Sequence, residues 1–194
     1  MSRAPSAPHA QAFLNRCRET LDGALADEGI VSASVQSRVK RADAVAAKRA
    51  RRPGLPINDY LGLRIIVDHV GLLERGARTV RAWGPALGLK LLQEENRFDR
   101  PGAGGYRALH FDFEIRDPAT AGVEPDDGIE VQITTALLAV LARLSHDLVY
   151  RTPGSDAEYV LADLEKLAEE GIRLDAGIAS LASAARTGAH KDDR

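Results

Sequence analysis

The chain has 194 residues, and a hydrophobic fraction of 44% with a charged fraction of 28% is ordinary for a globular protein. The formal net charge of −2 argues against a protein that coats nucleic acid through charge alone. The single cysteine, Cys17, excludes an internal disulfide and a Cys-rich metal site. No apolar run is long enough to span a bilayer, and the first residues lack the apolar centre of a signal peptide, so we expect a cytoplasmic protein.

The N-terminal third predicts a tail, a helix, a strand and a short basic helix. Residues 1–10 have the composition of a disordered tail. Apolar residues at helical spacing predict a helix over 12–28. The alternation of apolar and polar residues in IVSASVQSRV predicts a strand over 30–39, and the alanine-rich stretch 42–50 predicts a helix.

The middle of the chain predicts a buried strand between loops. Prolines and glycine mark residues 51–58 as a loop, and GLRIIVD predicts a buried strand over 62–68. A helix is expected over 71–83. Residues 87–95 fit a strand or a weak helix, and the glycine-rich stretch 96–105 predicts a flexible loop.

The C-terminal part predicts two strands and then helices only. Alternating apolar residues predict a strand over 109–115, and a second strand is expected over 128–134. Helical spacing predicts a helix over 135–150 and a final helix or helix pair over 156–185. About five strands interleaved with helices indicate an α+β fold with a mixed sheet flanked by helices.

The predicted elements divide the chain into three parts. Residues 1–10 form the tail, and residues 11–152 form one folded domain. Residues 153–194 form C-terminal helices with a disordered end, and they are a candidate oligomerisation element.

Two carboxylates are expected at the ends of neighbouring strands. Asp59 comes just before the strand 62–68, and Glu130 lies on the strand 128–134, with Gln132 on the same face. Mg²⁺ binds one or two carboxylates together with substrate phosphate oxygens, and a nearby carboxylate can take a proton from an attacking hydroxyl. An Asp before a strand is also a common cap or turn residue.

A basic constellation precedes the first carboxylate. Arg38 and Lys40 alternate out of a strand onto one face, and Lys48 comes one helix later. Together they can grip a triphosphate, Arg through forked hydrogen bonds and Lys as a point charge. A basic surface helix is the alternative interpretation. The acidic stretch 124–130 complements this basic segment in a manner that suits a polyphosphate with its metal ion.

An aromatic ring follows the glycine-rich loop. Tyr106 is placed to stack on a base, although a tyrosine packed on a sheet edge would give the same pattern. His110 lies four residues on, on the polar face of the next strand. Motifs of the GxxxxGK[ST], GxGxxG and GxSxG kinds are absent from the sequence, which argues against the familiar nucleotide folds and the α/β-hydrolases.

Five short motifs in order resemble the synthetase domain of the RelA/SpoT family, and in particular the stand-alone small alarmone synthetases. They are R-x-K with a Lys eight residues later (Arg38, Lys40, Lys48), DYLGLRI (59–65), GYRALH (105–110), EVQITT (130–135) and HDLVYR (146–151). The resemblance implies a nucleotidyltransferase-like fold. It also implies transfer of the β,γ-pyrophosphate of ATP to the 3′-hydroxyl of GDP or GTP, giving (p)ppGpp and AMP.

The resemblance also implies roles for individual residues. Asp59 and Glu130 would be the catalytic carboxylates that hold Mg²⁺, and Glu130 would also activate the 3′-hydroxyl. The ATP-binding residues would be Arg38, Lys40, Lys48 and Arg64. The acceptor-binding residues would be Tyr106, Arg107, His110, Gln132 and His146, with Tyr106 stacking on the base. Small relatives often form tetramers through C-terminal helices, and residues 156–185 are a candidate for this role, although their apolar pattern equally fits packing on their own sheet.

The sequence departs from the family pattern at three positions. Ala44 replaces a Ser, Thr134 replaces an Arg, and Gly104 replaces the Asn that is associated with reading guanine. The acceptor therefore stays open among guanine nucleotides, adenine nucleotides and the 3′ end of tRNA. The tRNA alternative would be a toxin with an antitoxin as partner, and a non-catalytic nucleotide-binding regulator is a third hypothesis.

Overall fold

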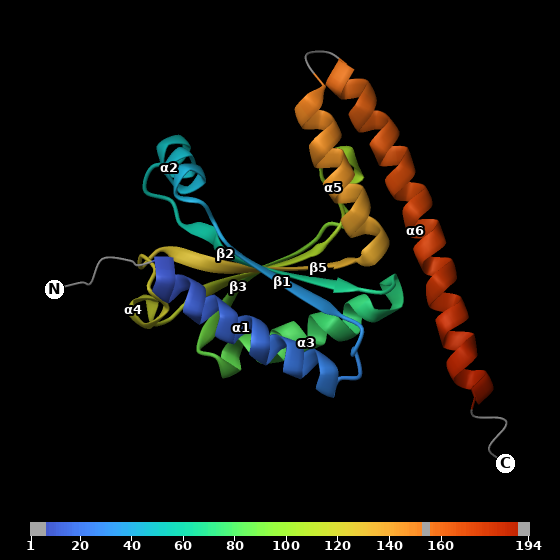
Figure 1. Ribbon diagram of the computed structural model, residues 1–194, viewed down its shortest axis with the longest axis horizontal. Helices are drawn as coiled ribbons and strands as arrows, with labels where there is room; N and C mark the ends of the chain where they lie inside the picture. Colours follow the sequence, from blue (N-terminus) through green and yellow to red (C-terminus); the bar gives the residue numbers. More distant parts are fainter. Residues whose placement is uncertain (1–6, 153–155, 190–194) are drawn as a thin grey trace.

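The computed structural model describes residues 7–152 and 156–189 (Figure 1). Its centre is a sheet of five strands, β1 (Ser34–Val39), β2 (Ile57–Val67), β3 (Leu89–Asn96), β4 (Leu109–Ile115) and β5 (Asp127–Thr135). The strand order is β1-β2-β5-β4-β3. Strands β2 and β5 run parallel, and the other neighbouring pairs are antiparallel. The predicted α+β fold with a mixed five-stranded sheet is confirmed.

One face of the sheet is covered by helices and forms the core. Helices α1 (Ala7–Asp27) and α3 (Leu73–Ala86) lie along this face, together with the short α4 (Pro118–Ala121) and a 3₁₀ turn η1 (Val70–Leu72) (Figure 1). The strands bury alternate side chains against them, since successive residues of a strand point to opposite faces. The largest completely covered side chains in this core include Leu14, Leu21, Leu63, Phe111, Phe113 and Ile129.

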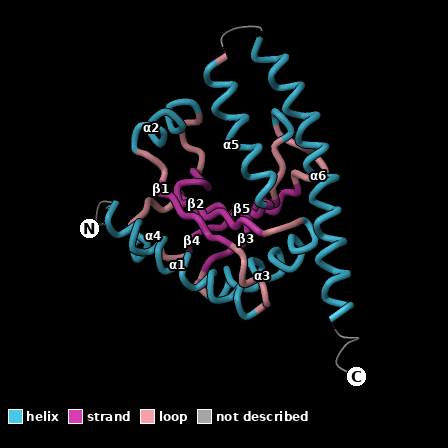
Figure 2. Tube along the Cα trace, turned by 45° about the vertical axis from the view of Figure 1, so that its right-hand side comes forward, coloured by secondary structure: helices cyan, strands magenta, loops and turns pink. Residues whose placement is uncertain are grey.

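The opposite face carries helices at its two ends. Helix α2 (Ala42–Arg51) lies at one end, and α5 (Ala136–Arg151) rises from the other (Figures 1 and 2). Helix α6 (Asp156–Ala189) runs alongside α5 and packs on a second 3₁₀ turn, η2 (Ala103–Gly105). The sheet surface between α2 and α5 is where polar side chains gather. Among the described helices, none combines the length and apolarity needed to cross a membrane.

The structure corrects several predicted boundaries. Helix α1 begins at Ala7 and Ala10 is buried, so the prediction of a disordered tail is wrong for residues 7–10; residues 1–6 lie outside the described residues. The reason is that Ala10 extends the apolar stripe of α1 by one turn onto the core. The segment 87–95, which fitted a strand or a weak helix, forms most of strand β3, and the final segment is a single helix. The predicted final helix ended at residue 185, whereas α6 continues to Ala189; of the predicted disordered end, residues 190–194 lie outside the described residues.

Strand β2 begins at Ile57, five residues before the predicted start. Asp59 therefore lies within the strand and not in the loop before it. Sequence patterns missed this extension because residues 58–60 are all half-buried and do not alternate, and the pairing with β5 is irregular between Ile57 and Leu61. An irregularity of this kind re-aims side chains at the rim of a sheet.

Candidate active site

Polar side chains from three neighbouring strands lie in rows across the open face of the sheet. In the first row Arg64 of β2 lies opposite Gln132 of β5, which lies opposite His110 of β4. In the second row Glu130 pairs with Asp112 of β4 on one side. These positions alternate with the core residues of each strand, so the pleat alone directs them to the same face.

On its other side Glu130 pairs with Gly62 of β2. Gly62 also lies opposite Arg38 of β1, and a Cβ atom at residue 62 would stand 3.3 Å from Cγ of Arg38. The missing side chain leaves room for Arg38 to lie across β2 beside the second row.

Asp59 is held by two lysines at the α2 end of this face. Lys48 of α2 donates from Nζ to Asp59 Oδ1 at 2.7 Å, and Lys40, just after β1, donates to Asp59 Oδ2. Burial acts to raise the pKa of Asp59, but the hydrogen bonds and charges of the two lysines outweigh it and hold the pKa below its usual range. The structure thus joins Lys40 and Lys48 of the predicted phosphate-binding set directly to a predicted metal ligand.

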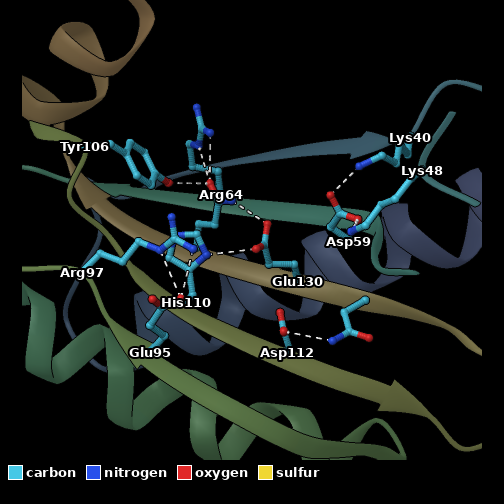
Figure 3. A network of polar contacts seen from close by, with 12 residues as sticks. Lys40, Lys48, Asp59, Arg64, Glu95, Arg97, Tyr106, His110, Asp112 and Glu130 are labelled. Carbon is cyan, nitrogen blue, oxygen red and sulfur yellow. Dashed lines mark hydrogen bonds and ion pairs between the residues drawn. The ribbon is translucent and has the colours of Figure 1, made fainter. Parts of the chain in front are cut away.

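Glu130 belongs to a second network. Its Oε1 lies 2.9 Å from Nδ1 of His110, and its Oε2 accepts from the amide of Gln132 (Figure 3). The amide oxygen of Gln132 accepts from Nη2 of Arg64 at 3.0 Å and from the hydroxyl of Tyr106 at 3.1 Å. One glutamine therefore connects a carboxylate, a guanidinium and an aromatic ring from separate segments of the chain.

The network keeps Glu130 ionised. Burial acts to raise its pKa, but the hydrogen bond and charge of His110 and the hydrogen bond of Gln132 lower it, and the net shift is downward. Its neighbour Asp112 behaves differently. Burial and the nearby charges of Glu130 and Asp59 raise the pKa of Asp112, although Asn58 donates a hydrogen bond to it at 3.1 Å.

A cavity of about 590 Å³ opens between this face and α5. Arg38 and Arg64 line its floor, Tyr106 forms part of its wall, and Arg143 and His146 reach it from α5. A smaller recess of about 140 Å³ beside it is lined by Arg38, Arg64, Glu130 and Gln132, among others. Cations in a cleft next to ionised carboxylates suit a polyphosphate ligand whose charge is shared between arginines and a metal ion.

Most of the predicted site residues converge on this face, but one does not. Arg107 points away: its Nη1 donates to the carbonyl of Phe98 at 2.8 Å, and the residue lines a separate cavity beside α3 and α6. The prediction that Arg107 contacts the acceptor finds no support in this placement. The physical reason is that Arg107 directly follows Tyr106 in an extended segment, where neighbouring side chains point in opposite directions.

His146 lines the main cavity, although its side chain is 82% exposed. Tyr150 and Arg151 complete the motif on α5, but their side chains lie outside the described ones.

Sequence reasoning assigned no role to Asp112, Asn58 and Arg97. Asp112 lies two residues after His110 on β4 and therefore on the same face of the sheet. This alternation was the sequence signal that could have identified Asp112 as a site residue. Arg97 lies with its guanidinium carbon 5.9 Å from the centroid of the Tyr106 ring and is held by Glu95. Arg97 directly follows β3, and the pairing of β3 with β4 brings it beside Tyr106, a contact that no local sequence pattern indicates.

The carboxylate oxygens on this face suit a magnesium ion, but the protein alone does not supply a complete set of ligands. Asp59 and Glu130 offer carboxylate oxygens, which Mg²⁺ prefers, and the charge of Asp59 acts to raise the pKa of Glu130. Within residues 7–152 and 156–189, no three His, Cys, Asp or Glu side chains converge as metal ligands. Two carboxylates together with phosphate and water oxygens meet the preference of Mg²⁺, so the residues present suit the ion together with a polyphosphate.

The fold is shared with solved structures. A GTP pyrophosphokinase family protein from Streptococcus pneumoniae matches with a TM-score of 0.69 and 21% identity, over 93% of this chain and 92% of that one. The small alarmone synthetase 1 from Bacillus subtilis matches with a TM-score of 0.69 and 22% identity, over 91% and 95%. The same synthetase bound to its product pppGpp matches with a TM-score of 0.66 and 20% identity, over 92% and 94%.

These likenesses establish that the chain has the fold of the small alarmone synthetases, as the motif resemblance implied. A scan against protein-family models finds no match, and a search of curated proteins finds none either.

Proposed function

We propose that this protein is an ATP-dependent pyrophosphotransferase that moves the β,γ-pyrophosphate of ATP to the 3′-hydroxyl of GDP or GTP. The observation that carries the proposal is the pair of ionised carboxylates, Asp59 and Glu130, on the same sheet face as an arginine-lined cavity. The shared fold supports it, and so does the pppGpp that the Bacillus subtilis relative binds as its product.

The reaction needs a nucleophile, a leaving group and a place for one proton. The acceptor 3′-oxygen forms a bond to the β-phosphorus of ATP while the bond from that phosphorus to the α-phosphate bridging oxygen breaks, and AMP leaves. Glu130 takes the proton of the 3′-hydroxyl, and His110 and Gln132 orient its carboxylate. Such transfers depend mainly on positioning and charge neutralisation.

The other residues hold the two nucleotides. Arg38 and Arg64 bind ATP phosphates from the cavity floor, and Lys40 and Lys48 do so once a phosphate replaces Asp59 as their partner. Asp59 and Glu130 would hold Mg²⁺, which neutralises charge on the pyrophosphoryl group during transfer. Tyr106 supplies the stacking surface for the acceptor base.

The same chemistry on another acceptor is the second candidate. Gly104 offers no side chain to a base edge, and this favours an adenine nucleotide or the 3′ end of tRNA as an alternative to guanine. The tRNA alternative would make the protein a toxin with an antitoxin as partner. A nucleotide-binding regulator without turnover is the third candidate, and the retained carboxylate pair argues against it.

A transfer assay tests the proposal. Purified protein with Mg²⁺ and γ-labelled ATP is incubated separately with GDP, GTP, ADP and bulk tRNA, and labelled product and AMP are measured. We expect label on a guanine nucleotide, and a loss of at least about a hundredfold in Asp59→Asn and Glu130→Gln. Asp163→Asn removes an exposed carboxylate of α6 outside the site and should leave transfer unchanged.

The outcome of the transfer assay also distinguishes the three candidate functions from one another. Label on ADP or tRNA alone would keep the chemistry and replace the acceptor. Nucleotide binding without AMP production from any acceptor would reject the enzyme in favour of the regulator.

A further inference from the structure

A further cavity, of about 400 Å³, lies between the turn η2, helix α5 and helix α6. Its walls are mainly apolar, and two polar side chains and one aromatic ring face into it. The lining includes Ala103, Tyr106, Ser145, His146, Val149 and Leu161. An apolar slot with one aromatic wall and a few polar groups is typical of a site for a flat heteroaromatic ligand.

The aromatic wall of this slot is held rigidly. The hydroxyl of Tyr106 donates to Gln132, and the edge-to-face contact with His110 places the two ring centroids 5.8 Å apart. The guanidinium of Arg97 lies against the ring as well. A stacking surface fixed before the ligand arrives loses little conformational freedom on binding.

Ser145 of α5 lies where a side chain at residue 104 would project. Gly104 has φ of +65°, and a Cβ atom built there would stand 2.6 Å from Oγ of Ser145 and 3.2 Å from Cδ2 of Leu161. The hydroxyl of Ser145 makes no hydrogen bond to another residue in the described part of the chain. A polar group at the rim of an apolar slot without a protein partner is available to a ligand.

We propose that this slot receives the purine base of the acceptor nucleotide and that Ser145 contacts the polar edge of that base in place of a residue-104 side chain. The proposal rests on the pyrophosphotransferase function and specifies its acceptor site. The base stacks on Tyr106, and its sugar extends into the main cavity, which shares Tyr106 and His146 with this slot and adjoins the recess lined by Glu130.

A serine in this place leads to weak discrimination between purines. A hydroxyl rotates and serves as donor or acceptor, so it pairs with O6 of guanine or with the N6 amino group of adenine. A fixed array of donors would reject the wrong base by orders of magnitude, but a single adaptable hydroxyl does not. The slot therefore accepts guanine and adenine diphosphates alike and disfavours a pyrimidine, which has a smaller stacking surface.

Calorimetric titration with GDP, ADP and UDP tests this directly, without turnover. We expect wild-type dissociation constants for GDP and ADP within about tenfold of each other, with weaker UDP binding. Ser145→Ala should weaken both purine nucleotides about fivefold, and Tyr106→Leu should weaken them by about tenfold or more. Ser180→Ala, another helical serine, bonded within α6, is the matched control and should bind as wild type does.

The outcomes of the titration and of the transfer assay distinguish a failure of the slot proposal from a failure of the proposed function on which it rests. Unchanged purine affinity in Ser145→Ala, unchanged purine affinity in Tyr106→Leu, or a wild-type preference above about a hundredfold for one purine each overturns the proposal even if pyrophosphate transfer occurs. Ser145-dependent binding of GDP and ADP without transfer supports the slot and removes the catalytic function. Absence of any nucleotide binding by the wild-type protein overturns both.

Discussion

At the scale of single residues, Gln132 connects the parts of the proposed reaction. Its amide oxygen accepts from Arg64 and Tyr106, and its amide nitrogen donates to Glu130. Each of these partners has a separate task in the proposed chemistry, and each is half-buried, so water replaces the lost hydrogen bonds poorly. Gln132 is therefore a positioning residue for both substrates.

Replacing Gln132 by leucine tests this role. The variant removes the hydrogen bonds that Arg64 and Tyr106 donate to Gln132, and it leaves Glu130 with its contact to His110 alone. We expect its free energy of unfolding to fall by about 1–3 kcal/mol. The kcat/KM of transfer should fall at least about a hundredfold because ring, guanidinium and carboxylate all lose their common support. Urea unfolding and the transfer assay measure the two effects.

Gln93→Leu is the matched control, because Gln93 is an exposed glutamine on β3 outside the network, and it should change neither quantity markedly. A Gln132→Leu protein that keeps a kcat/KM within threefold of wild type would show that the network has no role in transfer.

At the scale of elements, helix α6 supports the turn that presents Tyr106. Gly105 has φ of +72°, and a Cβ atom there would stand 2.5 Å from Cβ of Ala168. Leu164 and Ala168 are almost completely buried against this turn. About two turns further along α6, the buried carboxylate of Asp175 accepts from the backbone N–H of Val70, which ties α6 to η1. The C-terminal helix is thus part of the folded domain, and the prediction that separated it at residue 153 missed this packing.

Overpacking this contact tests the coupling between α6 and the acceptor slot. Ala168→Leu places three extra carbons against the backbone of the turn, and we expect a loss of about 1–3 kcal/mol in stability. Because the turn carries Tyr106, the KM for the acceptor should rise about tenfold while the KM for ATP changes little. Thermal unfolding and steady-state kinetics with each substrate varied in turn measure these effects.

The same substitution at the exposed Ala176 of α6 is the control and should leave both KM values unchanged. Equal effects of Ala168→Leu on the two KM values would contradict a specific role of the turn in acceptor binding.

At the scale of the whole molecule, α6 presents apolar side chains away from its own domain. Leu167, Leu174 and Leu181 recur at intervals of seven residues and are 50%, 61% and 73% exposed, and Ile178 is 40% exposed. This spacing is typical of a seam between helices. It supports the expectation of a homo-oligomer, with α6 of a second copy as the proposed partner of this surface.

The oligomeric state can be measured by light scattering. We expect a wild-type mass that is a multiple of the chain mass of 20.9 kDa. Leu174→Glu combined with Leu181→Glu should shift the mass to that of one chain, because charges would face each other across the seam. Since both side chains are exposed in the single chain, the variant should still fold.

Leu55→Glu changes an equally exposed leucine in the loop before β2 and should not alter the mass. A wild-type mass of one chain at micromolar concentration would contradict association through α6.

The sequence by itself determined the class of fold, most of the elements and the nature of the chemistry. Alternation with period two in β4 and β5 directed His110, Glu130 and Gln132 to one face, because the pleat is a local property of the backbone. The order of the motifs predicted the shared fold, and the two carboxylates were recognisable by their neighbours along the chain. These features depend on residues a few positions apart.

Only the tertiary structure decided which of those residues meet. The pairing of β2 with β5 brings Arg64 to Gln132, and the crossing of α2 over the sheet brings Lys48 to Asp59. The extended segment before β4 turns Arg107 away from the site, and α5 brings Ser145 against Gly104. The contacts of Arg64 with Gln132 and of Ser145 with Gly104 join segments far apart in the chain, and the other two join elements that only the fold places side by side. They follow from how the helices pack on the two faces of the sheet, and that packing depends on the whole core at once rather than on any local pattern.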